Sequence, residues 1–343
     1  MNELNIAVLG LGRLGCAHAR NLSQSVKGAN LKMVADPLEG KAESIAKELN
    51  VPKWSENPLD AIQDEAIDAI VIVTPTNTHG EMIIKAAEHG KHVFVEKPLT
   101  DTLEEADKVI KVIEEKQIIC QVGFMRRFDP AYFDAKQRIL AGEIGKPIYF
   151  KGITRDQGCP PASFIKHSGG AFLDISIHDY DIARYLMDDE IVSVAGHGRV
   201  LNYPYIAEYG DVDQAISYVE FKSGAVGDIE ASRNSPYGHD IRTEIIGTEG
   251  SLFIGTLRNQ DVTVMNDNGS TYEVIPDFQT RFGDAYRIEL EEFIKTIRAN
   301  EKPRVTALDS KINMQIALIA TDSFNQQGEK LHVGGNKDEQ VKL

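Results

Sequence analysis

The chain has 343 residues, of which 42% are hydrophobic and 26% are charged, and this suits a globular protein of two domains. Its formal net charge of -15 works against binding to nucleic acid or to an anionic membrane surface. No segment has the apolar length that spans a bilayer, and the first residues lack the pattern of a secretory signal. We therefore expect a cytoplasmic protein with a small neutral substrate and with no nucleic-acid or membrane partner.

The cysteines are few and scattered. Cys16, Cys120 and Cys159 lie far apart and form no Cys-x-x-Cys pair. This spacing predicts neither a disulfide framework nor a cysteine-based zinc site. We expect no metal.

The first third of the chain alternates short apolar runs with longer helical patterns. Near-continuous apolar strands separated by helices are typical of a parallel sheet that is buried on both faces. With right-handed crossovers, such a sheet is a doubly wound (Rossmann) α/β fold, which we assign to residues 1–123. The expected strands are Asn5–Leu9, Leu31–Ala35, Ala69–Val73, His92–Val95 and Ile118–Val122, and the expected helices are Leu14–Leu22, Gly40–Leu49, Gly80–His89 and Leu103–Glu115.

The period changes after Gly123, and residues 124–343 form the predicted second domain. Strands separated by turn signals favour an α+β domain with an open, largely antiparallel sheet. The last helix, at about 309–326, is a candidate to pack back on the first domain. The expected strands are Ile148–Thr154, Ile191–Val200, Ala215–Phe221, Val226–Ser232, Thr243–Ile246, Val262–Asn266 and Thr271–Ile275, and the expected helices are Pro130–Leu140, His178–Leu186, Ala285–Ala299 and Ser310–Phe324.

A glycine-rich turn follows the first expected strand. It reads Gly10-Leu11-Gly12-Arg13-Leu14-Gly15 and lies between a strand and a helix. Gly10 allows a tight turn, Gly12 lets the backbone approach a pyrophosphate, and Gly15 lets the helix pack close to the sheet. Arg13 and Leu14 open the helix whose N–H groups would face the phosphates. The alternative is a plain glycine turn.

Asp36 ends the next expected strand, at the position where the dinucleotide fingerprint has an acid. A carboxylate there accepts a hydrogen bond from a ribose 2′-hydroxyl and repels a 2′-phosphate. No arginine follows to reverse this preference. The cofactor predicted is therefore NAD rather than NADP.

Polar residues follow the third expected long strand. Thr74, Pro75, Asn77 and His79 lie at the carboxyl edge of the sheet, where open α/β folds bind ligands. We expect them to line the nicotinamide side of the cofactor. A proline turn in which Thr78 caps the next helix is the alternative, and the two interpretations are compatible.

Glu96-Lys97-Pro98 follows the next strand at the same edge. We assign Glu96 and Lys97 to the cofactor site, and a lysine there can also stabilise a developing alkoxide. An isolated lysine is more often a solvated surface charge. The Lys97–Pro98 peptide bond can be cis or trans.

The densest polar cluster of the second domain lies in the segment 169–181. Asp174 and His178 are four residues apart, so a helix would place them on one face. A partly buried histidine with a carboxylate to orient it can act as a general base near pH 7. A structural histidine is the alternative, and Asp179 and Asp181 can be simple helix-start acids.

Taken together, these motifs resemble the glucose–fructose oxidoreductase/inositol dehydrogenase family over almost the whole chain. The resemblance implies that Lys97, Asp174 and His178 are catalytic, and that they bind substrate together with Arg127, Asp156 and Tyr237. Within the family it is nearest to bacterial inositol 2-dehydrogenases. The motifs that carry it are the glycine turn, Glu96-Lys97-Pro98, the stretch from Gly123 to Asp129, Asp174-x-x-x-His178-Asp179, Tyr237-Gly238-His239-Asp240 and Glu244-Ile245-Ile246-Gly247.

The resemblance implies an NAD-dependent enzyme that oxidises a ring hydroxyl of myo-inositol or scyllo-inositol to the ketone. It also implies a homotetramer assembled through the second domain. The substrate stereoisomer and the direction of the reaction stay open. Three alternatives also stay open: a dehydrogenase of another sugar, an NAD-dependent glycosidase of the same family, and a dinucleotide sensor without turnover.

Overall fold

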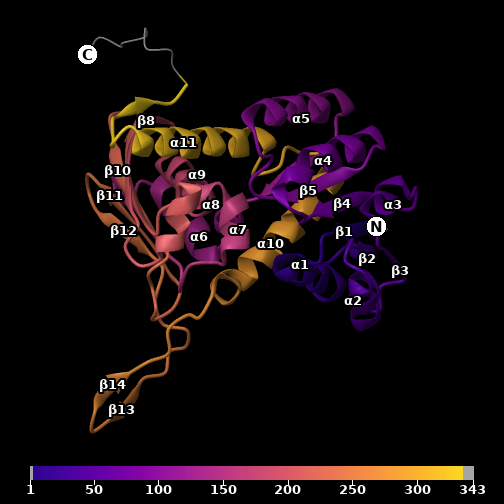
Figure 1. Cartoon of the computed structure of the whole chain (residues 1–343), viewed down its shortest axis with the longest axis horizontal. Coiled ribbons are helices and arrows are strands. Elements are labelled where there is room, and N and C mark those ends of the chain that lie inside the picture. The colour runs from indigo at the N-terminus through magenta and orange to yellow at the C-terminus, as the bar shows by residue number, and fades with distance from the viewer. Residues whose placement is uncertain (1–2, 335–343) are drawn as a thin grey trace. The chain divides into compact units, whose positions relative to one another are not determined.

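The computed structural model describes residues 3–334, and its chain forms two units. The first unit comprises Met1–Phe128 and Asp284–Ile312, and the second comprises Asp129–Gly283 and Asn313–Leu343. The chain passes from the second unit to the first within helix α10 (Phe278–Ala299) and returns within α11 (Ala307–Asn325) (Figure 1). A later segment thus joins the first unit, whereas the division expected from sequence crosses only once, near residue 123.

The first unit contains a six-stranded sheet in the order β3-β2-β1-β4-β5-β6, with every neighbouring pair parallel. The chain order reverses between β1 and β4, so the carboxyl ends of these strands form the switch point of a doubly wound fold. This confirms the predicted fold class. The strands are β1 (Leu4–Leu9), β2 (Ala29–Ala35), β3 (Lys53–Ser55), β4 (Ala69–Ile72), β5 (His92–Glu96) and β6 (Cys120–Gly123).

Apolar side chains on the first sheet pack against its helices. Val8, Val71 and Phe94 are fully buried and share one core with Leu290 and Phe293 of α10. Strands enclosed in this way need apolar residues at every position, which is why they were recognisable in the sequence. The helices are α1 (Arg13–Gln24), α2 (Lys41–Leu49), α3 (Pro58–Gln63), α4 (His79–Glu88) and α5 (Leu103–Lys116).

The second unit contains a seven-stranded sheet in the order β12-β11-β7-β10-β9-β8-β15. One neighbouring pair, β7 and β10, is parallel, and the other five pairs are antiparallel. The predicted open, largely antiparallel sheet is confirmed. The strands are β7 (Pro147–Arg155), β8 (Ile191–Arg199), β9 (Gln214–Phe221), β10 (Val226–Ser232), β11 (Asp240–Gly247), β12 (Ser251–Ile254) and β15 (Leu331–His332).

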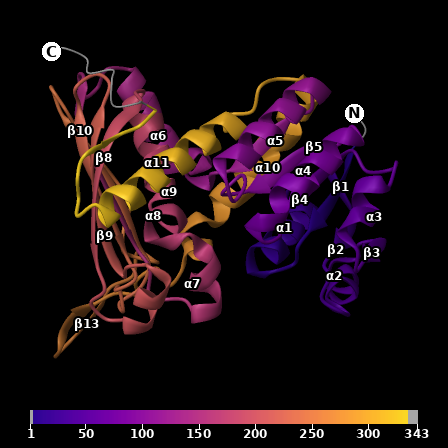
Figure 2. The same cartoon turned by 45° about the horizontal axis from the view of Figure 1, so that its top comes forward.

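Helices of the second unit lie along one face of this sheet, as Figure 2 shows. Side chains on β9 alternate accordingly: Ala215 and Val219 are buried, whereas Ile216 and Tyr218 are 44% and 42% exposed. The helices are α6 (Pro130–Leu140), α7 (Ala162–Ser168), α8 (Gly170–Asp174) and α9 (Ile177–Met187). Within residues 3–334, no helix combines the length and the apolar character needed to cross a membrane.

One expected strand was largely wrong. The segment Thr271–Ile275 was assigned as a strand, but β14 is Gly269–Thr271 and pairs with β13 (Val264–Asn266). The two-residue turn at 267–268 pairs Gly269 with Asn266, so β14 begins earlier than the apolar pattern suggested. Val274 forms only an isolated bridge with Arg258. The elements β3, β12, β15, α3, α7 and α8 are too short to have left a periodic signal.

Candidate active site

The glycine turn between β1 and α1 has the geometry that its sequence predicted. Gly10 adopts a positive φ of 86°, and a Cβ at Gly15 would lie 1.9 Å from the Gly10 carbonyl oxygen. Gly12 differs, because a Cβ there would meet no atom within 4 Å. Gly12 also precedes the first turn of α1, which contains no acidic residue and, among the described residues, no side-chain cap. Open space beside free helix N–H groups is what a pyrophosphate requires.

Asp36 directly follows β2 and lies beside this turn. Its Oδ2 accepts a hydrogen bond of 2.6 Å from the Leu11 N–H, and its Oδ1 accepts one of 2.9 Å from the Leu38 N–H. The carboxylate is therefore fixed next to the glycine turn while it stays partly exposed. A carboxylate with spare acceptor capacity at this position can bind the hydroxyls of a ribose.

The segment after β4 combines exposed and buried residues. Pro75 and Asn77 are exposed, and the Thr74 hydroxyl is 2.7 Å from that of Thr78. His79 is 1% exposed, and its two ring nitrogens lie 2.9 Å from the carbonyl oxygens of Thr74 and Pro98. Burial lowers the pKa of His79. The imidazole thus ties two loops at the carboxyl edge of the sheet, and we now expect it to support the cofactor site rather than to contact the cofactor.

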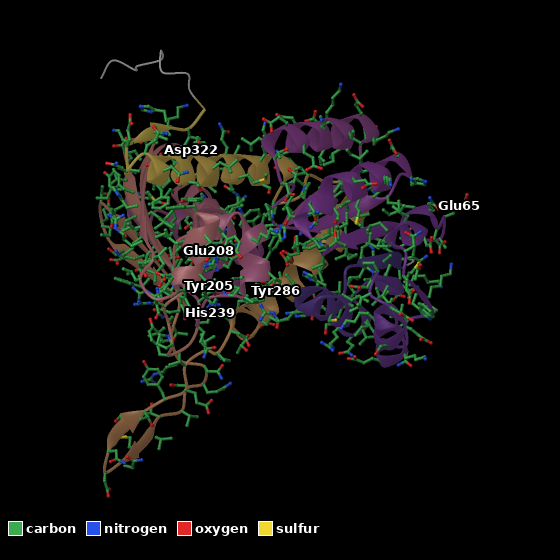
Figure 3. All side chains as sticks on the ribbon, in the orientation of Figure 1. Glu65, Tyr205, Glu208, His239, Tyr286 and Asp322 are labelled. Carbon is green, nitrogen blue, oxygen red and sulfur yellow. The ribbon has the colours of Figure 1, made fainter. Side chains whose placement is uncertain are left out.

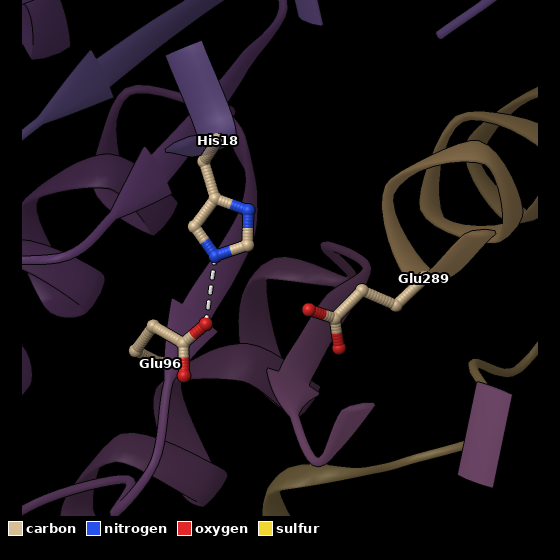
Figure 4. Close-up of side chains that lie close together, drawn as sticks. All are labelled: His18, Glu96 and Glu289. Atoms are coloured by element: carbon tan, nitrogen blue, oxygen red, sulfur yellow. Dashed lines mark hydrogen bonds and ion pairs between the residues drawn. The ribbon is translucent and has the colours of Figure 1, made fainter. Parts of the chain in front are cut away.

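Lys97 follows β5 at the same edge, and the Lys97–Pro98 peptide bond is cis. Lys97 is half-buried, whereas the adjoining Glu96 is only 7% exposed. The Glu96 carboxylate points to His18 of α1, with Oε1 2.7 Å from His18 Nε2 (Figure 4). Since its carboxylate oxygens are directed into the protein, we expect Glu96 to support the carboxyl edge of the sheet. Direct contact with the cofactor stays a prediction for Lys97.

Arg127 is buried in the first unit. One guanidinium nitrogen donates to the Arg304 carbonyl at 3.2 Å, and the other lies 3.4 Å from the Asp309 carboxylate. Asp309 in turn accepts hydrogen bonds from the N–H and the hydroxyl of Thr306. The segment 304–309 therefore holds Arg127 in place. Its contact with a substrate, which the family resemblance implied, stays a prediction.

Asp174 and His178 do not lie on one continuous helix, which corrects the sequence analysis. Asp174 is the last residue of α8, and His178 is the second residue of α9. Ile175 and Ser176 separate the two helices, although both keep backbone angles in the right-handed helical region, with φ widened to -100° at Ile175. The spacing of four residues therefore joins two short helices. Both side chains are half-buried in the second unit, as predicted for a site that admits a ligand.

The acids that follow His178 are structural. Asp179 is fully buried and accepts a hydrogen bond of 2.6 Å from the Thr154 hydroxyl of β7. Asp181 is also fully buried and accepts one of 2.7 Å from the side-chain amide of Asn313. These bonds fix α9 to its neighbours. The sequence analysis had left open that Asp179 and Asp181 have no direct chemical role.

Arg233 is a site residue that the sequence analysis missed. It directly follows β10, is fully buried, and lies 3.4 Å from Asp174 Oδ2 and 3.3 Å from Asp211 Oδ2. Asp211 Oδ1 also accepts the Ala171 N–H at 2.7 Å, which ties this ion pair to α8. A buried cation between two carboxylates stabilises both in their charged forms. The available signal was a lone arginine directly after an expected strand.

Asp156 lies next to Arg233 in the sheet, because β7 and β10 are parallel and end side by side. The Asp156 N–H donates to the Ser232 carbonyl at 2.8 Å, and its carboxylate is 3.2 Å from His239 Nδ1. His239 is 5% exposed and is labelled in Figure 3. Asp156 and Asp174 are thus brought to the same end of the second sheet by neighbouring groups.

Tyr237 is 47% exposed, and its hydroxyl is already engaged. It donates to Asp240 Oδ2 at 2.9 Å and accepts from Arg155 at 3.3 Å. Arg155 also makes two bonds to Glu230, of 2.8 and 2.7 Å. The exposed ring of Tyr237 can still cover a ligand, whereas its hydroxyl bonds to residues of the second sheet. Its role in substrate binding stays a prediction.

Comparison with known families gives two matches that together cover most of the chain. The model of the oxidoreductase family's NAD-binding Rossmann fold matches residues 4–124. The model of the same family's C-terminal alpha/beta domain matches residues 136–333. These matched ranges follow the two patterns of the sequence.

Individual relatives are similar over nearly their full lengths. The chain is 63% identical over 323 residues to a scyllo-inositol 2-dehydrogenase (NAD(+)) of Bacillus subtilis, with 94% of each chain covered. It is 38% identical to a Myo-inositol 2-dehydrogenase of Thermotoga maritima, with 94% of this chain and 97% of the other covered.

A solved structure of scyllo-inositol dehydrogenase from Lactobacillus casei, with bound NAD(H) and scyllo-inositol, has a TM-score of 0.92 and 33% identity. The alignment covers 97% of this chain and 100% of that chain. The same family is indicated by the glycine turn, the acid after β2, the matched domains and these relatives. The chain belongs to the Gfo/Idh/MocA family of oxidoreductases.

Proposed function

We propose that scyllo-inositol is the preferred substrate of this chain, which is an NAD-dependent inositol 2-dehydrogenase. The observation that carries the choice of stereoisomer is the 63% identity, over 94% of both chains, to a relative named as a scyllo-inositol 2-dehydrogenase. The relative named for the myo isomer is 38% identical. A neutral ring polyol also suits a protein with a net charge of -15.

The first unit supplies the features that fit NAD. The open space at Gly12 would admit the pyrophosphate, the N-terminus of α1 would stabilise its charge, and Asp36 would accept the ribose hydroxyls. Because Asp36 is a carboxylate held beside the turn, a 2′-phosphate would be repelled. When bound, NAD supplies the acceptor for the hydride that leaves the substrate carbon.

The residues of the chain handle the proton and the oxygen. In the proposed mechanism His178, in its neutral form, takes the proton from the reacting hydroxyl as the carbon–oxygen double bond forms. Lys97 donates a hydrogen bond to the same oxygen and stabilises its developing negative charge. Asp174, which lies 3.4 Å from Arg233, offsets the positive charge that His178 gains. No metal is needed for these steps.

A panel of neutral polyols with NAD tests this function. We expect the highest kcat/KM for scyllo-inositol, a lower value for myo-inositol, and little reduction of NAD with open-chain polyols or glucose. Absorbance of the reduced cofactor is the readout. A higher kcat/KM for myo-inositol would overturn the choice of stereoisomer. Release of nitrophenol from a nitrophenyl glycoside would identify the glycosidase alternative, and NAD binding without turnover of any polyol would identify a sensor.

The assembly is proposed as a homotetramer in the cytoplasm. The outer face of the second sheet carries Ile216, Tyr218 and Phe253, which are 44%, 42% and 77% exposed. Asp228 and Glu244 both pair with Lys151 of β7, so Tyr218, opposite Asp228, and Phe253, opposite Glu244, lie on one face. Large hydrophobic side chains exposed on a sheet face are typical of a subunit interface. Light scattering at micromolar concentration tests the assembly, and a monomer would contradict it.

A further inference from the structure

Three ionisable side chains that were not assigned to substrate gather in the interior of the first unit. His18 comes from α1, Glu96 ends β5 and Glu289 lies on α10, and each offers a nitrogen or an oxygen within 4.8 Å of the others (Figure 4). Glu289 and His18 are fully buried, and Glu96 is 7% exposed. Gly123 belongs to the same packing, since a Cβ there would lie 2.9 Å from the Glu96 carboxylate. The proposed function gives this cluster no role.

The two carboxyl groups are treated very differently by their surroundings. Glu96 Oε1 lies 2.7 Å from His18 Nε2, and its Oε2 accepts the Lys97 N–H at 3.3 Å. Both oxygens of Glu289 are buried and have no hydrogen-bond partner among the described residues. A carboxylate without donors cannot recover its lost hydration, whereas a neutral carboxylic acid loses much less. The geometry therefore favours charge on Glu96 and a proton on Glu289.

The charged groups around the cluster agree with this assignment. Burial, and then the nearby charge of Glu96, raise the pKa of Glu289 well above its ordinary range. The pKa of Tyr286, one turn earlier on α10, is also raised, chiefly by burial and then by Glu96 and Glu289. Arg13 and Arg126 oppose that rise at Tyr286. At Glu289, burial and the charge of Glu96 both raise the pKa.

We propose that Glu289 is a neutral carboxylic acid in the folded protein and that it positions Lys97 through Glu96. The side-chain amide of Gln121 of β6 donates to the backbone carbonyl of Glu289 at 2.9 Å, which fixes this turn of α10 against the sheet. The uncharged acid fills the space beside the His18–Glu96 pair without repelling it. Glu96 then keeps its bond to the Lys97 N–H at the carboxyl end of β5. The positioning step rests on the proposed catalytic role of Lys97.

The same three side chains would also be a plausible donor set for a divalent cation, which makes metal binding the main rival. A cation would neutralise both carboxylates and would take the nitrogen lone pair of His18. The 2.7 Å contact between His18 Nε2 and Glu96 instead has the length of a direct hydrogen bond. Two ligands of one metal ion lie farther apart than this. We therefore assign the neutralising charge to a proton.

Infrared spectroscopy of the whole protein at neutral pH tests the proton directly. We expect the carbonyl band of a protonated carboxylic acid in the wild type, its loss in Glu289→Gln, and its retention in the control Glu291→Gln. Glu291 lies on the same helix but forms a surface pair with Arg287. Absence of the band, or a band that persists in Glu289→Gln, would overturn the assignment. So would one equivalent of tightly bound metal that Glu289→Gln releases.

Kinetics test the positioning role separately. Glu289→Ala should lower kcat by up to about 10²-fold with little change in the KM for NAD. A small displacement of Lys97 from the reacting oxygen is enough to slow the reaction by this factor. Glu289→Gln should restore kcat, since it keeps the shape of the neutral acid. Failure of Glu289→Gln to restore kcat in a folded protein would overturn this role. The infrared result needs no substrate, so it stands even if the wild type fails to oxidise any inositol.

Discussion

Asp174 and Glu289 are both acids on helices, but the two units handle their charge in opposite ways. Asp174 lies beside the fully buried Arg233, which it shares with Asp211. Glu289 is fully buried with no cation and no donor on either oxygen among the residues described. The two acids therefore differ both in burial and in the donors within reach, and both factors decide whether an acid is charged.

The difference fits the task proposed for each group. A charged Asp174 can offset the positive charge that His178 gains during proton transfer, so it needs a partner that keeps it ionised. Glu289 faces Glu96, whose carboxylate already accepts from His18 and from the backbone of Lys97. A second charge there would repel Glu96. In this proposal, one charge lies near each of the groups expected to be catalytic, and it is kept there by different means.

The largest expected effect tests whether both regions serve one reaction. His178→Ala should lower kcat by about 10²–10⁴-fold through loss of the positioned base, and Lys97→Ala by about 10²–10³-fold through loss of the oxygen donor. NAD affinity, measured by protein fluorescence, should stay nearly unchanged, because we propose that the dinucleotide is held mainly by the glycine turn and Asp36.

The double variant should lose less than the product of the single effects, since both groups act on one hydroxyl. A His178→Ala variant with most of its activity at neutral pH would move the role of base to Lys97. A large loss of NAD affinity in either variant would show that its role is in cofactor binding.

Replacing Arg233 tests whether Asp174 and Asp211 depend on their shared cation. Arg233→Gln leaves Asp174 and Asp211 without their shared cation and should lower the free energy of unfolding by about 3–5 kcal/mol. Because Asp174 is partly exposed, we expect a value near the lower end of this range. Urea unfolding measures the effect.

Arg242→Gln is the matched control, since Arg242 pairs with Asp240 of the same sheet but is 41% exposed. Arg242→Gln should lower the free energy of unfolding clearly less than Arg233→Gln does. In an Arg233→Gln background, Asp174→Asn should recover part of the lost stability, because it removes one unpaired charge. No recovery would mean that packing, rather than charge, is what Arg233 supplies.

The sequence predicted the two sheets and named candidate site residues, but it did not predict the charged partners that surround them. The glycine turn and Asp36 act through nearby backbone, so their spacing carried the information. Arg233 meets Asp174 only because α8 packs against β9 and β10, and Arg233 directly follows β10. Glu289 meets Glu96 from a helix far along the chain. Pairings of this kind depend on three-dimensional packing and leave no local pattern.

The pH dependence of stability tests whether Glu289 is neutral in the folded protein. The pKa of Glu289 is raised in the folded protein, so its favourable contribution is complete below the ordinary carboxyl pKa of about 4.3 and is lost as pH rises. Above that pH the unfolded chain has released a proton that the folded chain retains. Relative to Glu289→Gln, the wild type should lose about 1.4 kcal/mol per pH unit until the raised pKa is reached.

Urea unfolding at several pH values, for the wild type, Glu289→Gln and Glu291→Gln, measures this slope. Glu291→Gln should run parallel to the wild type, because Glu291 lies at the surface in a partly exposed pair with Arg287. If the wild type and Glu289→Gln ran parallel from pH 5 to pH 8, Glu289 would be charged in the folded state and the contrast with Asp174 would disappear.

The smallest expected effect concerns an exposed pair that has a cation but little burial. Lys53 and Asp64 form an ion pair at the surface, with side chains 47% and 17% exposed. The hydrogen bond from Lys53, and then that from the Ala66 N–H, lower the pKa of Asp64. A lowered carboxyl pKa stabilises the fold above the ordinary carboxyl pKa, and this stabilisation is lost as pH falls through the lowered value.

Lys53→Met should therefore reduce the free energy of unfolding by less than about 1 kcal/mol at neutral pH, and by less still in high salt. The difference from the wild type should shrink as Asp64 becomes protonated in acid. This trend is opposite in sign to the one expected at Glu289, where acid favours the wild type. Water replaces the lost cation at Asp64, whereas it does not reach Arg233. A cost for Lys53→Met equal to that of Arg233→Gln would show that burial does not set the value of a cation beside an acid in this protein.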